Sequence, residues 1–140
     1  MTTGFSQVLA SIDRAAGTAA VTVPPDWLQG RTVFGGMQMA LATRAMRTAL
    51  PLPAAALPLR SAQMTFVGPL LGGQPIYMSA ESVRTGKTTV HARCDLRHED
   101  GKLASTVVAI EAASSLEATA QFVIPPVAND EVPRIATEVP

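Results

Sequence analysis

A chain of 140 residues with 47% hydrophobic residues is long enough to bury the core of one domain. Its 11 basic and 11 acidic residues give a net charge of zero, which argues against nucleic acid as a partner, since nucleic-acid-binding proteins carry a basic patch. No apolar run reaches ~18 residues and the first residues lack a signal-peptide pattern, so we expect a cytoplasmic protein without a membrane span. The single cysteine, Cys94, and the lack of a Cys/His cluster argue against a disulfide and a metal site.

The chain opens with a short amphipathic segment. Within residues 5–14, four apolar residues share one helical face, which predicts a helix that Gly17 ends. The β-branched alternation of residues 18–23 then predicts a strand, and the pair Pro24-Pro25 ends it.

The main helix is expected from Gly35 to Leu50, after a loop at residues 26–33 and before Pro51 and a Pro/Ala loop at 52–58. At 100° per residue, its apolar residues form one broad face, and the small alanines on this face would let a sheet pack closely against it. The members of this face are Met39, Leu41, Ala42, Ala45, Met46, Ala49 and Leu50.

Four segments that alternate apolar and polar residues predict strands at 60–67, 76–84, 88–97 and 103–112. The strand at 88–97 has the cleanest pattern, with Val90, Ala92, Cys94 and Leu96 on one face and polar residues on a wet or interface face. The strand at 103–112 is apolar on both faces, as in a central strand. Tight hairpins are expected at 84–87 and 99–101.

One long helix followed by an antiparallel meander requires a sheet that curls around the helix and almost encloses it. We therefore expect an α+β domain over residues 1–113, with five or six antiparallel strands wrapped around the helix. The Pro-rich residues 114–140 are expected to form a surface tail or an extended linker.

The glycine pair Gly35-Gly36 stands at the mouth of this helix. The first amides of a helix lack partners within it, and the helix dipole favours negative charge beside them. The pair therefore predicts a site for a phosphate or for the oxyanion formed when a thioester or ester is attacked. The alternative is a tight junction between loop and helix.

The order of these elements resembles the hotdog-fold thioesterases, and most closely one hotdog unit of the acyl-CoA thioesterase II family. The likeness covers roughly residues 18–113 and is carried by four segments. They are Val33-Phe34-Gly35-Gly36, Phe66-Val67-Gly68-Pro69, Arg84-Thr85-Gly86-Lys87 and the stretch from Glu99 to Ser105. The resemblance implies a homodimer or a dimer of dimers with active sites between subunits, and hydrolysis of acyl-CoA or a related thioester. The Pro-rich tail is similar to the linker between two hotdog units.

The sequence departs from the resemblance at the expected base. Phe34 stands where related single-domain thioesterases often carry histidine, and Thr43 stands where they carry a carboxylate. Ser61 and Val108 align with the Asp and Gln of the active half of double-hotdog proteins. These departures leave a second interpretation open, namely a non-catalytic acyl-CoA or lipid binder.

Three residues of the helix are candidates for catalysis. Gly36 would polarise the thioester carbonyl, and Gln38 would orient water or substrate unless it bonds a neighbouring loop. Thr43 would hold a water, or else bond a preceding carbonyl as helical threonines do. Asp26 is either an acid near the glycine loop or a turn residue, and Trp27 is expected to be an anchor.

Substrate contacts are expected at Phe34 and Gly35, and at the basic hairpin where Arg84, Gly86, Lys87 and Thr88 would meet the phosphates or pantetheine of coenzyme A. The alternative for this hairpin is a solvated turn. His91 is expected on a solvated or subunit-facing sheet surface and His98 beside a turn, and neither neighbours a nucleophile in sequence. Met37, Met39, Met46, Met64 and Met78 suit either an acyl pocket or ordinary core filling. Neither a metal nor a redox cofactor is implied, and coenzyme A enters as part of the substrate.

Overall fold

The computed structural model describes residues 2–15, 18–50 and 57–113. The elements in chain order are α1 (Phe5–Ala10), β1 (Asp13–Ala15), β2 (Thr18–Thr22), a 3-10 turn (Pro25–Trp27), β3 (Leu28–Gln29), β4 (Thr32–Val33), α2 (Gly35–Ala49), β5 (Leu59–Phe66), β6 (Pro75–Thr85), β7 (Thr89–His98) and β8 (Leu103–Ala112). The expected stops at Gly17 and Pro51, most of the 52–58 loop and the tail at 114–140 lie outside the described residues.

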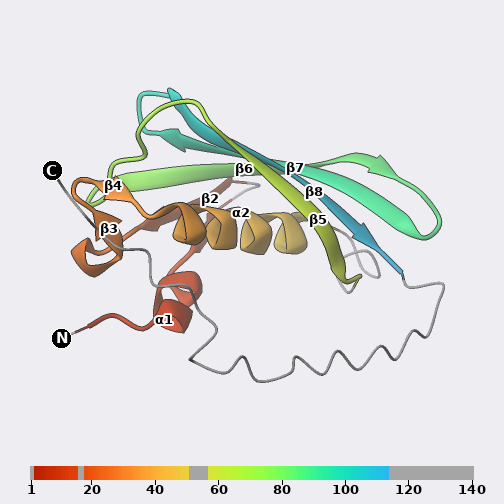
Figure 1. Ribbon diagram of the computed structural model, residues 1–140, viewed down its shortest axis with the longest axis horizontal. Coiled ribbons are helices and arrows are strands. Elements are labelled where there is room, and N and C mark those ends of the chain that lie inside the picture. The colour runs from red at the N-terminus through yellow and green to blue at the C-terminus, as the bar shows by residue number, and fades with distance from the viewer. Residues whose placement is uncertain (1, 16–17, 51–56, 114–140) are drawn as a thin grey trace, which may run out of the picture.

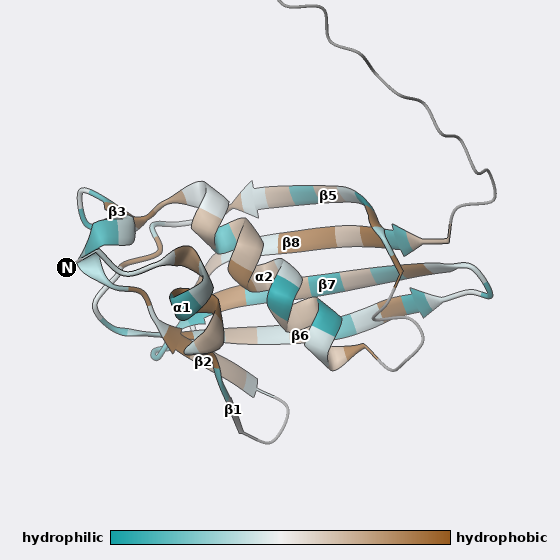
Figure 2. Cartoon of the chain, turned by 90° about the horizontal axis from the view of Figure 1, so that it is seen from below, coloured by the Kyte–Doolittle hydropathy of each residue, from teal (hydrophilic) through white to brown (hydrophobic). Residues whose placement is uncertain are grey.

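A six-stranded antiparallel sheet in the order β1-β2-β6-β7-β8-β5 carries α2 on one face (Figure 1). The long helix and the meander of strands agree with the predicted α+β arrangement. The helix runs obliquely across the strands, with α1 beside its first half (Figure 2). The short β3–β4 pair lies at the start of α2. No helix within the described ranges is long and apolar enough to cross a membrane.

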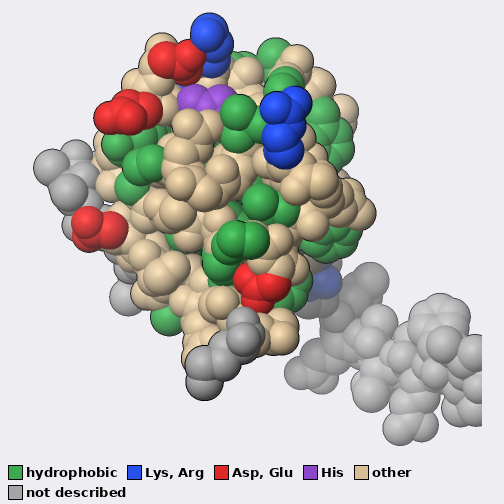
Figure 3. All heavy atoms as spheres, turned by 90° about the vertical axis from the view of Figure 1, so that its left-hand side faces the viewer, with side chains coloured by type: hydrophobic (Ala, Val, Ile, Leu, Met, Phe, Trp, Pro, Cys, Tyr) green, Lys and Arg blue, Asp and Glu red, His purple; other side chains and the backbone are tan. Residues whose placement is uncertain are grey.

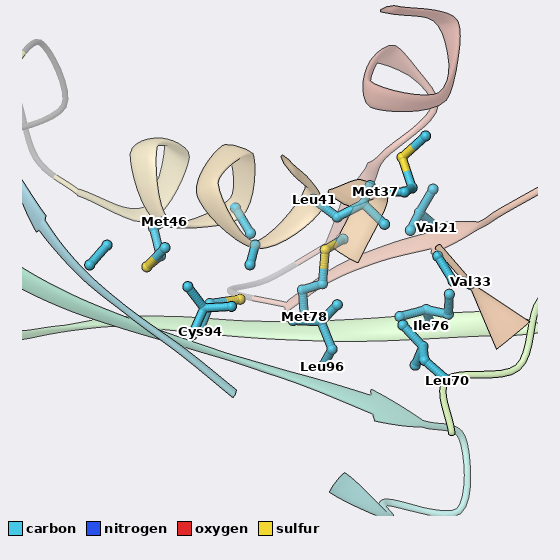
Figure 4. Packing of buried hydrophobic residues seen from close by; sticks show 14 of the residues in the cluster. Val21, Val33, Met37, Leu41, Met46, Leu70, Ile76, Met78, Cys94 and Leu96 are labelled. Carbon is cyan, nitrogen blue, oxygen red and sulfur yellow. The ribbon is translucent and has the colours of Figure 1, made fainter. Parts of the chain in front are cut away.

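The core lies between α2 and the sheet (Figure 4). Val90, Ala92, Cys94 and Leu96 are each at most 1% exposed, so the predicted inward face of β7 is confirmed. Burial, with a smaller contribution from the neighbouring Asp95, raises the pKa of the Cys94 thiol to about 12. Of the five methionines considered for an acyl pocket, Met37, Met46 and Met78 are fully buried in this core.

The expected helix over residues 5–14 is too long. The helix α1 ends at Ala10, and residues 13–15 instead pair with β2, as Asp13 does with Ala20. The short strand β1 satisfies backbone groups that a longer helix would have satisfied internally. Val8 still faces the core at 1% exposure. The expected loop at 26–33 likewise contains the 3-10 turn and the β3–β4 pair.

The buried face of α2 begins earlier than predicted, because Met37 and Gln38 are also buried. Ala49, which was expected on this face, is exposed because it borders a hollow beside the helix. Arg44 and Arg47, in the second half of the helix, are exposed. The enclosure of the helix is therefore partial in a single chain.

The face of the sheet that points away from α2 carries a charged network centred on Asp95. Its carboxylate accepts hydrogen bonds from Thr106 Oγ1 and Arg97 Nη2, each at 2.8 Å. Arg93 lies 4.0 Å from Asp95 and pairs with Glu81 at 2.6 Å. Burial by itself would raise the pKa of Asp95, but the two hydrogen bonds and the charges of Arg93 and Arg97 outweigh it and lower the pKa.

We expect Asp95→Asn to lower the free energy of unfolding by about 1 kcal/mol at pH 7, as is usual for half-exposed charged networks. A lowered native pKa means that this stabilisation is present above the unfolded-state value of 3.8 and is lost as pH falls through the native pKa. Urea unfolding of both proteins at pH 7 and well below pH 3.8 measures the difference. A gap that persists unchanged in acid would assign the loss to packing rather than to charge.

Candidate functional site at the N-terminus of the long helix

The helix α2 begins without a side-chain cap. Phe34 occupies the N-cap position and its side chain makes no capping bond. The amide of Gln38 donates to the Phe34 carbonyl at 3.1 Å, but the amides of Gly35, Gly36 and Met37 donate to no described residue. These free donors lie at the positive end of a 15-residue helix, where negative charge is favoured.

A hollow of about 410 Å³ opens at this end of the helix, lined in part by Phe34, Gly35, Gln38 and Phe66. Phe34 and Phe66 are 43% and 61% exposed, and they contribute apolar surface to a lining that also includes Gln29, Thr32 and Gln38. Figure 3 shows this end of the molecule, with hydrophobic side chains gathered between charged ones. No ionisable side chain of the described residues lines the hollow.

Backbone contacts from two loops fix the approach of the chain to α2. The Val33 amide donates to the Leu70 carbonyl at 2.8 Å, and the Phe34 amide donates to the Trp27 carbonyl at 3.2 Å. A Cβ at Gly35 would lie 3.1 Å from the Phe66 ring, and one at Gly36 would overlap the Phe34 ring. Both glycines therefore allow aromatic rings to close over the first turn.

Gln38 is 4% exposed and joins three elements. Its Nε2 donates to the Val33 carbonyl of β4 at 2.8 Å, and its Oε1 accepts from Ser105 Oγ of β8 at 2.9 Å. It thus bonds two strands rather than a loop, and it anchors the first turn of α2 to the sheet. Ser105 was not identified from the sequence, although its inward place on β8 was a usable signal.

The hydroxyl of Thr43 donates to the Met39 carbonyl at 2.8 Å, which is the helical bond considered as its alternative role. With its proton used in this way, the oxygen can only accept a hydrogen bond from a water. Its catalytic role stays a prediction.

The basic hairpin between β6 and β7 lies at the opposite end of the sheet from the start of α2 (Figure 1). Ser105, which bonds Gln38, pairs with Leu96, whereas Val90 pairs with Thr85 beside the hairpin. From Leu96 to Val90 the strand runs about 20 Å. Within one chain the structure therefore does not bring the hairpin to the glycine pair.

The hairpin borders a separate hollow of about 300 Å³, which is lined by Arg84, Gly86, Lys87, Thr88, Thr89 and His91. The two basic residues are exposed and make no ion pair with a described residue. Their predicted contact with coenzyme A remains a prediction.

His98 and Trp27 support the loops around the site. His98 Nε2 lies 3.0 Å from the Pro69 carbonyl and its Nδ1 lies 3.2 Å from Gln74 Nε2. Trp27 donates from its indole to the Thr3 carbonyl at 2.9 Å and packs on Phe5, so it is an anchor as predicted. Asp26 accepts from the Thr3 amide, in keeping with a structural place. No group of three metal-ligating side chains occurs among the described residues.

Comparison with known proteins confirms the fold. The structure is similar to zebrafish thioesterase superfamily member 2 (TM-score 0.67, 22% identity, 81% of this chain and 88% of that one). It is also similar to the PaaI protein of the Escherichia coli phenylacetic acid degradation operon (TM-score 0.67, 20% identity, 78% and 87% covered). A candidate thioesterase II of Thermobifida fusca gives a TM-score of 0.71 at 20% identity, covering 89% of this chain and 44% of that one.

This chain therefore spans less than half the length of the Thermobifida protein. These likenesses confirm the predicted hotdog fold. A search of curated proteins found no significant match. A sequence model of one family, described as the acyl-CoA thioesterase N-terminal domain, matches residues 23–123. Because that match covers most of the chain, including the glycine pair and every strand from β3 to β8, the chain belongs to the family of acyl-CoA thioesterase N-terminal domains.

Proposed function

We propose that this protein hydrolyses an acyl thioester of coenzyme A, with the free amides at the start of α2 as the oxyanion site. The observation that carries the proposal is the set of undonated amides at Gly35, Gly36 and Met37, at a helix start where Phe34, Gly35 and Gln38 line a hollow. Water adds to the thioester carbonyl, negative charge gathers on the carbonyl oxygen, and the amides stabilise it. Collapse of this intermediate releases a carboxylic acid and the thiol.

Phe34 and Gly35 would line the entry for the acyl chain, and Gln38 would act as a positioning residue. Because Gln38 bonds both β4 and β8, it holds the first turn of α2 in one orientation. Fixed donors lose no free energy to reorganisation when charge develops. The reaction needs neither a metal nor a redox cofactor.

A second copy of the chain would complete the site through the edge of the sheet at β5. This eight-residue strand is at the end of the strand order, contains no proline and is mostly exposed. Long, unprotected edges pair readily with other strands. Phe66 and Val67, which are 61% and 58% exposed, adjoin the same edge.

Antiparallel pairing of two β5 edges would reverse one sheet relative to the other. The end of the second copy that carries the Arg84–Thr88 hairpin would then lie on the side of the first copy's α2 N-terminus. That arrangement would supply cations for the phosphates of coenzyme A, which a single chain does not place there.

Phe66→Glu should therefore halve the mass measured by light scattering, because it puts a charge into the paired edge. Val83→Glu is the matched control, since Val83 is equally exposed at 61% but lies on β6. An unchanged mass in Phe66→Glu, with the same thermal stability, would remove this edge as the contact.

Free-thiol release from acyl-CoAs of several chain lengths tests the proposed activity. We expect turnover that saturates with substrate and that depends on chain length. If none of the thioesters is hydrolysed, the proposal of catalysis fails.

One observation favours a second function, the non-catalytic binding of an acyl-CoA. The hollow at the start of α2 has no ionisable side chain among the described residues to serve as a base. Tight binding of a non-hydrolysable acyl-CoA without thiol release from the matching thioester would establish this alternative.

A further inference from the structure

A third hollow, of about 210 Å³, lies beside the C-terminal half of α2. It is bounded by Ala45 and Ala49 of the helix, by Ala19 of β2, and by Met78 and Ala80 of β6. We call it the alanine groove.

The alanine groove is separate from the proposed thioester site. Its helical wall begins at Arg44, which is about 12 Å along the helix axis from Gly36. It lies toward β2 and β6, whereas Gly35 approaches Phe66 of β5 at the other edge of the sheet. The two hollows share no lining residue.

The groove is hollow because small side chains face each other across it. Alanines occupy both the helical and the strand side, so no side chain reaches across the space. The groove is open to solvent at its edge, where Thr18 and Ala49 are exposed, so a ligand can enter it from the surface. Its apolar wall gives ordered water few partners, and an apolar ligand would displace that water at little cost.

The rim of the groove is cationic. Arg44 is the only charged residue among those that line it, and its guanidinium makes no ion pair with a described residue. Thr18 and Thr48 add hydroxyls at the same rim, although the Thr48 hydroxyl already donates to the Arg44 carbonyl. A guanidinium presents two parallel donors that match the two oxygens of a carboxylate.

We propose that the alanine groove binds an aliphatic carboxylate, with its chain against the alanines and Met78 and its head group on Arg44. At ~30 Å³ for each water-sized group, the space holds a chain of about seven carbons. The positive rim selects the carboxylate over an amine or an alcohol of the same length. This binding does not require that the protein hydrolyse thioesters, although hydrolysis would release a compound of this class.

Titration with octanoate tests the proposal, with binding followed by calorimetry and by the NMR signal of the Met78 methyl group. The variant Met78→Leu identifies that signal by its absence. We expect saturable binding of octanoate with a shift of that resonance, and much weaker binding of octylamine and of butyrate. Arg44→Gln should weaken octanoate at least tenfold, whereas Arg31→Gln, an exposed arginine of the β3–β4 turn, should leave it unchanged. Octylamine binding as tightly as octanoate, or full affinity in Arg44→Gln, would overturn the assignment.

Filling the groove provides a second arm that does not depend on charge. Ala80→Leu should abolish octanoate binding. Ala49→Leu, at the exposed rim, should have the same effect and replaces Ala80→Leu if that variant unfolds at a lower temperature than the wild type. If octanoate still binds to both variants, its site lies elsewhere and the proposal is refuted. The same titration in Gly36→Pro should match the wild type, so that failure of catalysis and failure of this site are told apart.

Discussion

Gly36→Pro should lower kcat for thiol release by about 10²- to 10³-fold, the usual loss when one oxyanion donor is removed. Proline lacks the amide hydrogen that this position offers, and its ring is tolerated in the first turn of a helix, where no intrahelical bond is lost. Gly35 precedes it without a Cβ, so part of the clash with a preceding residue is absent. Initial rates with a saturating acyl-CoA measure the effect.

Gly36→Ala is the matched control because it keeps the amide and adds only a Cβ. Both substitutions push against the Phe34 ring, which is 43% exposed and can turn away. We expect the alanine variant to stay within a few-fold of the wild type, with similar thermal midpoints for all three proteins. Equal rates for the proline and alanine variants would mean that the Gly36 amide has no part in catalysis.

The local sequence pattern was sufficient to predict those elements that bury one face and expose the other. The alternation in β7 predicted which side chains face α2, because a helix on one face of a sheet buries every second residue. The start of α2 at Gly35 was also predicted correctly, and its end differed by one residue. These features depend on neighbours in sequence.

Features that depend on partners distant in sequence were not predictable. The pairing of Asp13 with Ala20 is local by contrast, and it was missed because the apolar face of residues 5–14 continues past the end of α1. The hydrogen bond between Gln38 and Ser105 requires that β8 pass under the first turn of α2. The separation of the basic hairpin from Gly36 follows from strand order, which residue pattern alone leaves open.

Glu111 is the clearest case of a residue that the sequence analysis missed. It occupies the last inward position of β8, in line with Ser105, Val107 and Ala109, and is 0% exposed. Its Oε1 lies 3.3 Å from Nε of Arg47, and its Oε2 has no partner among the described residues. A carboxylate at an inward position of an otherwise apolar strand, opposite an arginine in the last turn of the helix, was the available signal.

Arg47→Met should lower the free energy of unfolding by about 3 kcal/mol, because it leaves the Glu111 carboxylate buried without a counter-charge. Breaking a buried pair usually costs ~3–5 kcal/mol, and the 43% exposure of Arg47 lets water reach the site and places the effect at the lower end. Urea unfolding at neutral pH measures it. Arg44→Met is the control, since Arg44 lies on the same helix without an ion pair to a described residue and should change stability by less than ~0.5 kcal/mol.

Removing both charges should reverse most of that loss. In the double variant Arg47→Met with Glu111→Leu, no charge is buried, and apolar replacement of such pairs is often neutral or stabilising. A double variant less stable than Arg47→Met would show that the pair contributes net stability through its geometry. Because Gln38 with Ser105 and Arg47 with Glu111 attach opposite ends of α2 to the same strand, loss of the second pair should also loosen the helix whose first amides face the substrate.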